Sequence, residues 1–505
     1  MNNLHQKSAV ELSKLITANE VSSREVTQHF INRIEEVNPK LNAVVVKLYE
    51  DALKKAEEAD ELQTKGESLG KLHGLPFTIK ECLDYTGTPS TLGVLARKKD
   101  VAKATDLYVE ALQNEGGIVL GKTNVPQLMI FIECTNRVYG TTNNPINPKF
   151  TPGGSSGGEG AIVGAKSSPF GIGTDIGGSV RFPAAFCGAC SIKPTMWRTF
   201  DQTRFGETTF SGPIMPVTGV IANYAEDLAL ILEIMNQAAT TRWKTESLQN
   251  YKETDISKLK VGYFLTDGFF EPMAAVKRGV LEAVEKLKSL GVEVVEFDPP
   301  RVEFCEEIFY RILTANGGDL FYELLDGEKP VKQLKDMMML AAASSWKQNS
   351  ARTLANLFRQ KNMSRLVSYF GGRGLEFIQK WGEERTNYQR ELENAMEKEN
   401  LDAILSPMAV LPAFLQNTAD KVGLGGNYSI LYNVSGFPAG VARVGEVKAN
   451  EAVARKTSFD LIERAIAKTE PLTAGLPLSV QIAAKPWRED IVISLIEVLH
   501  QRKES

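Results

Sequence analysis

Histidine is scarce in this chain, which has four among 505 residues. His5 and His500 lie near the two ends, and His29 falls inside an expected helix. His73 precedes a glycine in an expected turn. A Ser-His-Asp hydrolase needs a histidine held beside its serine, so this distribution does not support such a triad. The Gly-x-Ser-x-Gly nucleophile elbow is absent as well.

Cysteine is also rare, and its count is odd: Cys82, Cys134, Cys187, Cys190 and Cys305. An odd number fits free thiols in a reducing compartment better than a disulfide framework. Cys187 and Cys190 have Cys-x-x-Cys spacing, but no second pair of that kind completes a zinc site. We therefore expect buried structural thiols, with no metal site and no cofactor.

Long apolar runs and a strong charge of one sign are missing too. No stretch of about 18 apolar residues is found, and the start at Met1 lacks the apolar segment of a signal peptide. The net charge is −4, which disfavours nucleic acid as a partner. With 43% hydrophobic and 24% charged residues, the sequence predicts a globular cytoplasmic protein without a membrane span.

Helical and strand patterns alternate along the chain. Capping boxes beginning at Ser8 and Ser22 predict two helices, and Pro39 is expected to end the second. Further helices are predicted near residues 51–65, 105–115, 224–236, 276–290 and 491–499. Strands are predicted near residues 75–79, 118–120, 261–265, 292–297, 403–405 and 478–483. This alternation predicts an α/β fold, with residues 1–70 as a helical arm packed on a core of residues 71–505.

Residues 331–373 depart from the overall composition because basic residues greatly outnumber the single acid, Asp336. The basic residues are Lys332, Lys335, Lys347, Arg352, Arg359, Lys361, Arg365 and Arg373. Apolar residues lie between them. A basic amphipathic helical insert suggests peripheral contact with an anionic membrane. Cap helices over the core, or an interface between subunits, are the alternatives, because amphipathic helices are common in soluble proteins.

Two glycine-dense turns each present a serine, in Gly153-Gly154-Ser155-Ser156-Gly157-Gly158 and in Gly177-Gly178-Ser179. Glycine lets the backbone approach a ligand closely. A serine beside bare N–H groups can act as a nucleophile. A flexible linker is the alternative, but the turns continue into apolar segments, residues 161–163 and 172–175, that are typical of packed core.

Without a usable histidine, a lysine is the candidate base. Lys80 follows the apolar run at residues 75–79, which places its amine at the end of an expected strand. A lysine accepts a proton only when it is neutral, and burial favours that form. Its position alone does not distinguish this role from that of an ordinary solvated lysine.

Residues 153–184 resemble the signature of the amidase signature family. Further blocks resemble its fatty acid amide hydrolase branch, so that the similarity covers most of the chain from about Leu72. These blocks are Lys122-Thr-Asn-Val-Pro-Gln127 with Met129, Phe182-Pro-Ala-Ala-Phe-Cys-Gly188, Ser406-Pro-Met408, Leu431-Tyr-Asn433 with Phe437-Pro-Ala-Gly440, and Gly475-Leu-Pro-Leu-Ser-Val-Gln481. The resemblance implies one large domain whose mixed central β-sheet is covered by helices on both faces, with residues 331–373 as a cap.

The resemblance also implies a catalytic triad of Lys80, Ser155 and Ser179. Ser179 would attack the substrate carbonyl, and Ser155, after a cis Gly154–Ser155 peptide bond, would relay the proton to neutral Lys80. Ser156 would hydrogen-bond Lys80.

Supporting roles follow from the same resemblance. The oxyanion hole would consist of the N–H groups of Ile176, Gly177, Gly178 and Ser179. Asp175 and Arg181 would support the site or form a structural ion pair. Met129 would line the acyl channel or belong to the core.

The implied function is a serine hydrolase that cleaves fatty acid amides, such as N-acylethanolamines and primary fatty amides, to a fatty acid and an amine. A homodimer is implied as well. The alternatives are a small-amide or aryl-amide hydrolase, an amidotransferase subunit that acts on charged tRNA, and a non-catalytic relative.

Overall fold

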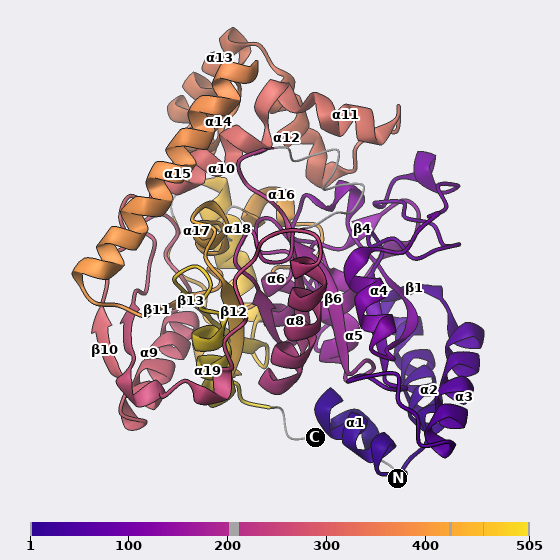
Figure 1. Cartoon of the computed structure of the whole chain (residues 1–505). Coiled ribbons are helices and arrows are strands. Elements are labelled where there is room, and N and C mark those ends of the chain that lie inside the picture. The colour runs from indigo at the N-terminus through magenta and orange to yellow at the C-terminus, as the bar shows by residue number, and fades with distance from the viewer. Residues whose placement is uncertain (1–2, 201–211, 424–426, 458, 503–505) are drawn as a thin grey trace.

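The computed structural model describes residues 3–200, 212–423, 427–457 and 459–502, and its centre is an eleven-stranded sheet (Figure 1). In spatial order the strands are β1 (Val44–Lys47), β3 (Ile118–Thr123), β2 (Pro76–Lys80), β6 (Phe170–Asp175), β8 (Val217–Ala222), β7 (Cys190–Lys193), β12 (Ala439–Glu446), β13 (Pro477–Ala484), β11 (Ala403–Pro407), β9 (Lys260–Tyr263) and β10 (Glu293–Glu296). A small hairpin joins β4 (Thr135–Asn136) and β5 (Gly140–Thr141).

Helices surround this sheet. They are α1 (Ala9–Thr17), α2 (Ser23–Leu41), α3 (Tyr49–Thr64), α4 (Leu107–Asn114), α5 (Gly157–Gly164), α6 (Arg181–Cys187), α8 (Ala225–Thr240), α9 (Ala274–Ser289), α10 (Val302–Leu313), α11 (Asp319–Leu325), α12 (Lys332–Ala342), α13 (Ser345–Leu357), α14 (Lys361–Tyr369), α15 (Leu375–Lys398), α16 (Ala419–Val422), α17 (Asn427–Val434), α18 (Leu461–Thr469) and α19 (Glu489–Leu499). Short 3-10 turns are η1 (Leu4–Gln6), η2 (Leu95–Arg97), η3 (Gln127–Met129), η4 (Tyr251–Glu253), η5 (Ile256–Lys258), η6 (Ala315–Gly318), η8 (Ala449–Glu451) and η9 (Glu470–Leu472).

The sheet is mixed, as the resemblance implies. The strands β3, β2 and β6 run parallel, and β6 pairs antiparallel with β8. Every residue of β2, β3, β6, β7 and β8 is buried. A strand buried along its whole length needs cover on both faces, and the flanking helices supply it. The prediction of an α/β fold with a helix-covered mixed sheet is confirmed.

The parallel pair β2 and β6 positions the candidate site. Ile79 lies beside Ile172 in the register of these strands. The chain leaves both strands at the same edge of the sheet, so Lys80 and Thr174 are brought together there. Functional groups commonly gather at the carboxyl ends of parallel strands.

The N-terminal segment follows the sequence with two differences. Both capping boxes are confirmed, with Glu11 N–H bound to Ser8 Oγ and Glu25 N–H bound to Ser22 Oγ. The prediction that Pro39 ends its helix is wrong, because Pro39 sits inside the last turn of α2 and left-handed Asn42 (φ 52°) ends it. The sequence pattern also missed β1, through which this segment joins the central sheet.

Residues 331–373 form the helices α12, α13 and α14, which lie together at one end of the molecule (top of Figure 1). Within the described part of the chain, none of the helices has both the length and the apolar character that a membrane crossing requires.

Candidate active site

Lys80 is fully buried at the end of β2, with its amine bound to three oxygen atoms. Its Nζ lies 2.8 Å from Ser155 Oγ, 2.8 Å from Thr174 Oγ1 and 3.2 Å from the Thr174 carbonyl oxygen. A charged amine donates to all three oxygens. A neutral amine offers a lone pair, and the Ser155 hydroxyl can then donate to it, so the same geometry serves proton transfer in either direction.

Thr174 is a site residue that the sequence pattern did not single out. It is the penultimate residue of β6, and both its hydroxyl and its carbonyl oxygen contact Lys80 Nζ. Ser156 Oγ donates to the same carbonyl at 3.4 Å, which links Ser156 to Lys80 through Thr174. Only the parallel pairing of β2 with β6 brings a threonine 94 positions away onto the lysine.

The two serine turns lie against each other. The Ser156 N–H donates to the Ser179 carbonyl at 3.0 Å. The Gly154–Ser155 peptide bond is cis, which confirms the expectation. Ser155 is buried beside Lys80, whereas Ser179 is partly exposed and faces a cavity.

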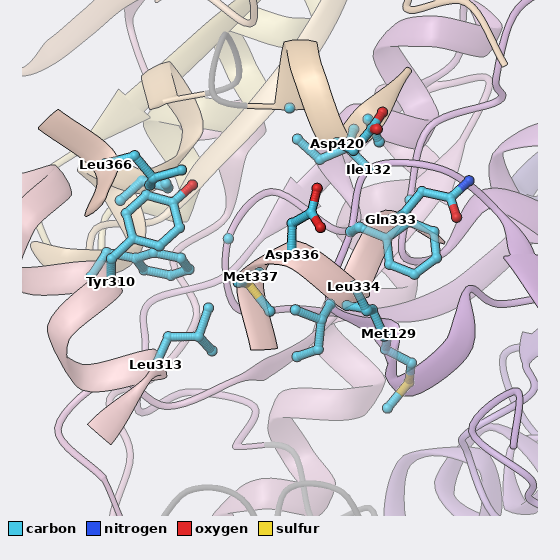
Figure 2. A pocket seen from close by; sticks show the side chains of 18 of the residues that line it. Met129, Ile132, Tyr310, Leu313, Gln333, Leu334, Asp336, Met337, Leu366 and Asp420 are labelled. Carbon is cyan, nitrogen blue, oxygen red and sulfur yellow. The ribbon is translucent and has the colours of Figure 1, made fainter. Parts of the chain in front are cut away.

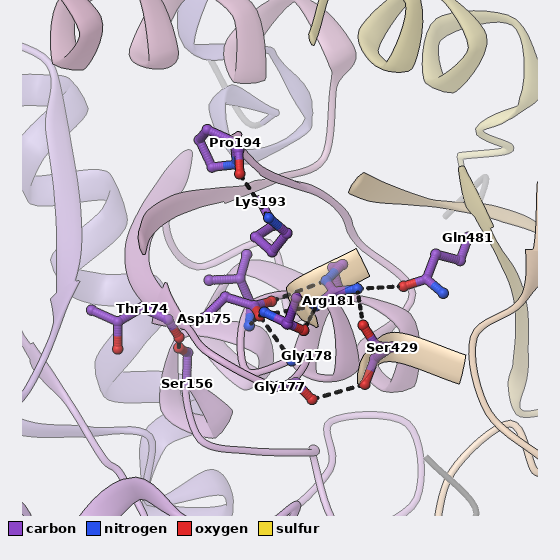
Figure 3. Close-up of polar contacts among 12 residues, drawn as sticks. Ser156, Thr174, Asp175, Gly177, Gly178, Arg181, Lys193, Pro194, Ser429 and Gln481 are labelled. Atoms are coloured by element: carbon purple, nitrogen blue, oxygen red, sulfur yellow. Dashed lines mark hydrogen bonds and ion pairs between the residues drawn. The ribbon is translucent and has the colours of Figure 1, made fainter. Parts of the chain in front are cut away.

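Asp175 organises the turn that carries Ser179 (Figure 3). Its carboxylate accepts the Gly178 N–H at 2.8 Å and the Val180 N–H at 3.1 Å. The Arg181 side chain binds both of its oxygens, at 3.0 and 3.1 Å. Burial alone would raise the pKa of Asp175, but the Arg181 guanidinium and the hydrogen bonds outweigh it and hold this pKa well below its usual range.

Arg181 extends this network to distant parts of the chain. Its guanidinium donates to Asn433 Oδ1 at 2.5 Å, to Gln481 Oε1 at 2.6 Å and to the Ser429 carbonyl at 2.9 Å. Arg181 is fully buried, so these contacts satisfy a cation that would otherwise be costly. The Asp175–Arg181 pair is thus a buried structural ion pair that also shapes the Ser179 turn.

Three N–H groups of this turn are available to a ligand. In the described part of the structure, no acceptor lies against the N–H groups of Ile176, Gly177 or Ser179. The Gly178 N–H is already bound to Asp175. Gly178 has φ +106°, and a Cβ on it would lie 2.6 Å from the Phe182 ring, so this position requires glycine.

A carboxyl group, Glu159, is buried behind Lys80. It accepts hydrogen bonds from the hydroxyls of Thr78 at 2.7 Å and Thr123 at 2.8 Å. Burial raises the pKa of Glu159 to about 8, although these hydrogen bonds oppose the shift. Glu159 is therefore mostly protonated at neutral pH, which limits the negative charge that would otherwise favour the protonated form of Lys80.

Ser179 belongs to the lining of a mostly apolar cavity. Figure 2 shows this cavity from close by. Its volume is about 170 Å³. Met129 is one of the residues that line the cavity. Its backbone is left-handed, with φ 59°. The main apolar residues of the wall are Phe131, Ile132, Phe309, Leu313, Leu334, Met337, Leu340, Met363, Leu366 and Phe370.

The helices of the insert complete this cavity. Leu334 and Met337 come from α12, and Leu366 comes from α14. Polar groups are few, with Gln333, Asp336 and Asp420 prominent among them (Figure 2). Two helices of the insert, α12 and α14, therefore form part of the wall of the cavity that Ser179 lines.

The five cysteines are all free and buried, as expected. Burial raises the pKa of the Cys190 thiol and of the Cys187 thiol well above the usual value. Protonated, enclosed thiols are unreactive, so both residues are structural.

Residues 25–493 match the family described as Amidase. The match includes both serine turns and Lys80. The chain belongs to the amidase family. This amidase is 31% identical to Fatty-acid amide hydrolase 1 of Sus scrofa over 495 residues, which are 96% of this chain and 83% of the relative. It is 28% identical over 514 residues to one of the subunits of the glutamyl-tRNA(Gln) amidotransferase of Fusobacterium nucleatum, covering 99% of this chain and 97% of the relative.

Solved structures share the fold of this amidase. A structure titled "Fatty acid amide hydrolase" superimposes with a TM-score of 0.81 at 23% identity, covering 99% of this chain and 86% of the other. This likeness shows that the two proteins share a fold.

Proposed function

We propose that this amidase cleaves long-chain fatty acid amides, including N-acylethanolamines and primary fatty amides, to a fatty acid and an amine. The apolar cavity that opens on Ser179 is the observation that carries this proposal. Each methylene group of an alkyl chain that is buried in an apolar cavity contributes about 0.8 kcal/mol of favourable free energy to binding. Asp336 in the cavity disfavours a free carboxylate through like-charge repulsion, which suits an uncharged amide better than an acid, whereas Asp420 is paired with Lys332.

In the proposed acylation step, Ser179 Oγ attacks the carbonyl carbon while its proton passes to Ser155 and the Ser155 proton passes to neutral Lys80 Nζ. The developing oxyanion accepts hydrogen bonds from the free N–H groups of the Ser179 turn. The 2.8 Å contact between Lys80 Nζ and Ser155 Oγ supports this relay. Ser179 acts as the nucleophile because it faces the cavity, whereas Ser155 is enclosed.

Collapse of the tetrahedral intermediate breaks the C–N bond. The proton returns from Lys80 through Ser155 to the departing nitrogen, which leaves as a neutral amine. Water then attacks the acyl-Ser179 ester while the same relay accepts its proton. The relay returns this proton to Ser179 Oγ as the bond to the acyl group breaks and the fatty acid is released. No metal or cofactor is part of the proposed steps.

Labelling of the nucleophile tests this assignment. A fluorophosphonate probe should modify the purified protein at Ser179, and Ser179→Ala should abolish the labelling. Ser13→Ala, which removes an exposed hydroxyl from α1, is the matched control. Labelling of Ser179→Ala at another residue would refute the assignment.

Rates across a series of amides test the substrate. kcat/KM should rise from acetamide to long-chain primary amides, by up to about fourfold for each methylene group that the cavity buries. Equal rates for short, aryl and long-chain amides would overturn the fatty amide proposal and favour a general amidase. Transfer of ammonia to charged tRNA would instead favour the amidotransferase role.

We also propose that the protein is cytoplasmic, dimeric and in peripheral contact with membranes through α12 and α13. Light scattering of the purified protein tests the dimer, and a monomer mass at micromolar concentration would exclude it. The exposed apolar side chains of α13 support the membrane contact.

A further inference from the structure

A second cavity lies where the N-terminal segment meets the end of the chain. Figure 1 shows α1 and α19, which belong to these two segments, at the end of the molecule opposite α12, α13 and α14. Its volume is about 720 Å³. The chain ends are joined at its wall by Tyr224, whose hydroxyl donates to the Gln6 carbonyl and whose ring lies 4.4 Å from the Arg502 guanidinium.

This cavity is separate from the active site. α5 begins just after Ser156, and α6 begins two residues after Ser179. The opposite ends of these helices, at residues 164–166 and 187–188, line the second cavity. The two helices therefore stand between it and the catalytic serines.

Basic side chains dominate the lining of the second cavity. They are Arg33, Lys166, Arg443 and Arg502, together with His5 and His500. No carboxylate occurs among the described residues that line it. Glu36, 2.6 Å from Arg33, and Glu446, 3.8 Å from Arg443, contact these arginines from outside the lining. The concave surface therefore carries an excess of positive charge in a chain whose net charge is −4.

Arg33 has donor capacity that the protein leaves unused. Its Nη1 binds Glu36, and its Nη2 donates to the Ala165 carbonyl at 3.4 Å at the end of α5. Its Nε is buried, and no acceptor for it lies in the described part of the chain. Because that N–H is enclosed, an anion in the cavity would reach Arg33 through Nη1 and Nη2 at the end of its partly exposed side chain.

The two histidines of the lining have lowered pKa values, to which burial contributes most and the neighbouring cations contribute next. Burial, Arg443 and Arg502 together lower the pKa of His500 to about 4. Burial, Arg33 and Lys166 lower the pKa of His5. His500 Nδ1 accepts the Arg443 N–H at 3.1 Å, so in neutral His500 the proton is on Nε2, which is a further donor.

We propose that this cavity binds a small polyanion that carries two or more phosphate groups. Arginine forks match phosphate oxygens, and cations contributed by α2, β12 and the chain end can reach more than one phosphate. The apolar side chains of Val37, Pro145 and Ile146 in the same lining leave room for an organic group beside the phosphates. The phosphates can belong to a soluble molecule or to a lipid headgroup.

Calorimetric titration of the whole protein with inorganic pyrophosphate, and separately with ADP, tests the proposal at low ionic strength. We expect saturable binding with one site per chain. Arg443→Gln and Arg502→Gln should each weaken it about tenfold or more, as expected for a lost ionic hydrogen bond. Lys286→Gln removes one exposed charge from α9 and should leave the affinity unchanged.

Thermal unfolding without ligand shows whether each variant is folded, and exposed Arg502 provides a variant that leaves the core intact. Equal affinity in Arg502→Gln and Lys286→Gln, or no binding at roughly 1 mM pyrophosphate, would overturn the proposal. Vesicles of phosphatidylcholine with phosphatidylinositol bisphosphate, whose headgroup carries more than one phosphate, distinguish the source. Vesicle binding that Arg502→Gln weakens and pyrophosphate displaces identifies a headgroup, and pyrophosphate binding without that competition identifies a soluble phosphate.

Discussion

At the scale of the residue, the candidate base is defined by its neighbours more than by its own identity. Lys80 is enclosed at the end of β2, where the oxygens of Ser155 and Thr174 surround its amine. The sequence identified Lys80 and Ser155 through the family signature. It contained no signal for Thr174, because a threonine near the end of a buried strand is ordinary in any α/β protein.

Thr174→Val removes one hydroxyl and keeps the shape of the side chain. Lys80 Nζ then loses its 2.8 Å contact and is less well fixed toward Ser155, so kcat should fall about tenfold while KM changes little. Steady-state kinetics measure this effect. Thr174→Ser, which restores a hydroxyl, should recover most of kcat; failure of that rescue would mean that the methyl group matters instead.

Glu159 links pH to stability. Its pKa is about 8 in the folded protein and near the ordinary 4.5 when unfolded, so folding favours its protonated form. The stabilisation is complete below about pH 4.5 and is lost as the pH rises through 8, at about 1.4 kcal/mol per pH unit at most.

Glu159→Gln should therefore lose less stability than the parent protein between pH 5 and pH 8, measured by urea unfolding. Burial also raises the pKa of Asp227 to about 8, so Asp227 contributes a loss of the same sign in both proteins. The difference between the two proteins isolates Glu159. Parallel stability curves would show that Glu159 is ionised in the folded state.

At the scale of the element, the three helices of residues 331–373 differ in what their apolar side chains face. α12 and α14 turn apolar residues into the cavity. α13 exposes Trp346 (75%) and Leu357 (74%), and Phe358 (67%) follows it. Four of the basic residues counted in the sequence have partners in the fold. Arg365 stacks on Phe269 and Arg359 on Phe459, while Lys332 pairs with Asp420 and Arg373 with Asp319. The exposed apolar and basic residues of α13 support the proposed membrane contact.

Charge reversal on α13 tests that contact. Lys347→Glu with Arg352→Glu should weaken binding to vesicles of phosphatidylcholine and phosphatidylserine at least about 30-fold, because each basic residue near an anionic surface contributes about 1 kcal/mol. Lys286→Glu with Lys398→Glu, on α9 and α15, is the charge-matched control. Co-sedimentation at low and high salt measures the effect, and equal binding by both double variants would rule out α13 as the contact.

At the scale of the whole molecule, Arg181 joins segments that are far apart in the sequence. Asn433 and Gln481 belong to blocks that carried the family resemblance, and both bind its guanidinium. Those blocks therefore hold the Ser179 turn in place through one buried cation.

Arg181→Met leaves Asp175 buried without its counterion, and the free energy of unfolding should fall by about 3–5 kcal/mol. Arg24→Met breaks an exposed pair with Glu57 and should cost about 1 kcal/mol or less. Urea unfolding of both variants compares the two losses. Similar values would show that Arg181 is not the link between these segments.

Local patterns predicted much of this architecture. Both capping boxes, the strand that ends at Lys80 and the glycine turns follow from residue types at short spacing, because turns and caps are local. The end of α2 and the presence of β1 do not follow from local patterns. The helix continues past Pro39 to Asn42, and the four-residue strand β1 forms only because β3 is there to pair with it.

The sequence by itself determined the family, the two serine turns and the lysine at a strand end, since these depend on short runs of residues. The tertiary structure alone decided that Thr174 meets Lys80, that α12 and α14 close a cavity over Ser179, and that basic residues from both ends of the chain converge on a second cavity. The physical reason is that strand pairing and helix packing bring together residues up to hundreds of positions apart, and no local pattern records such contacts.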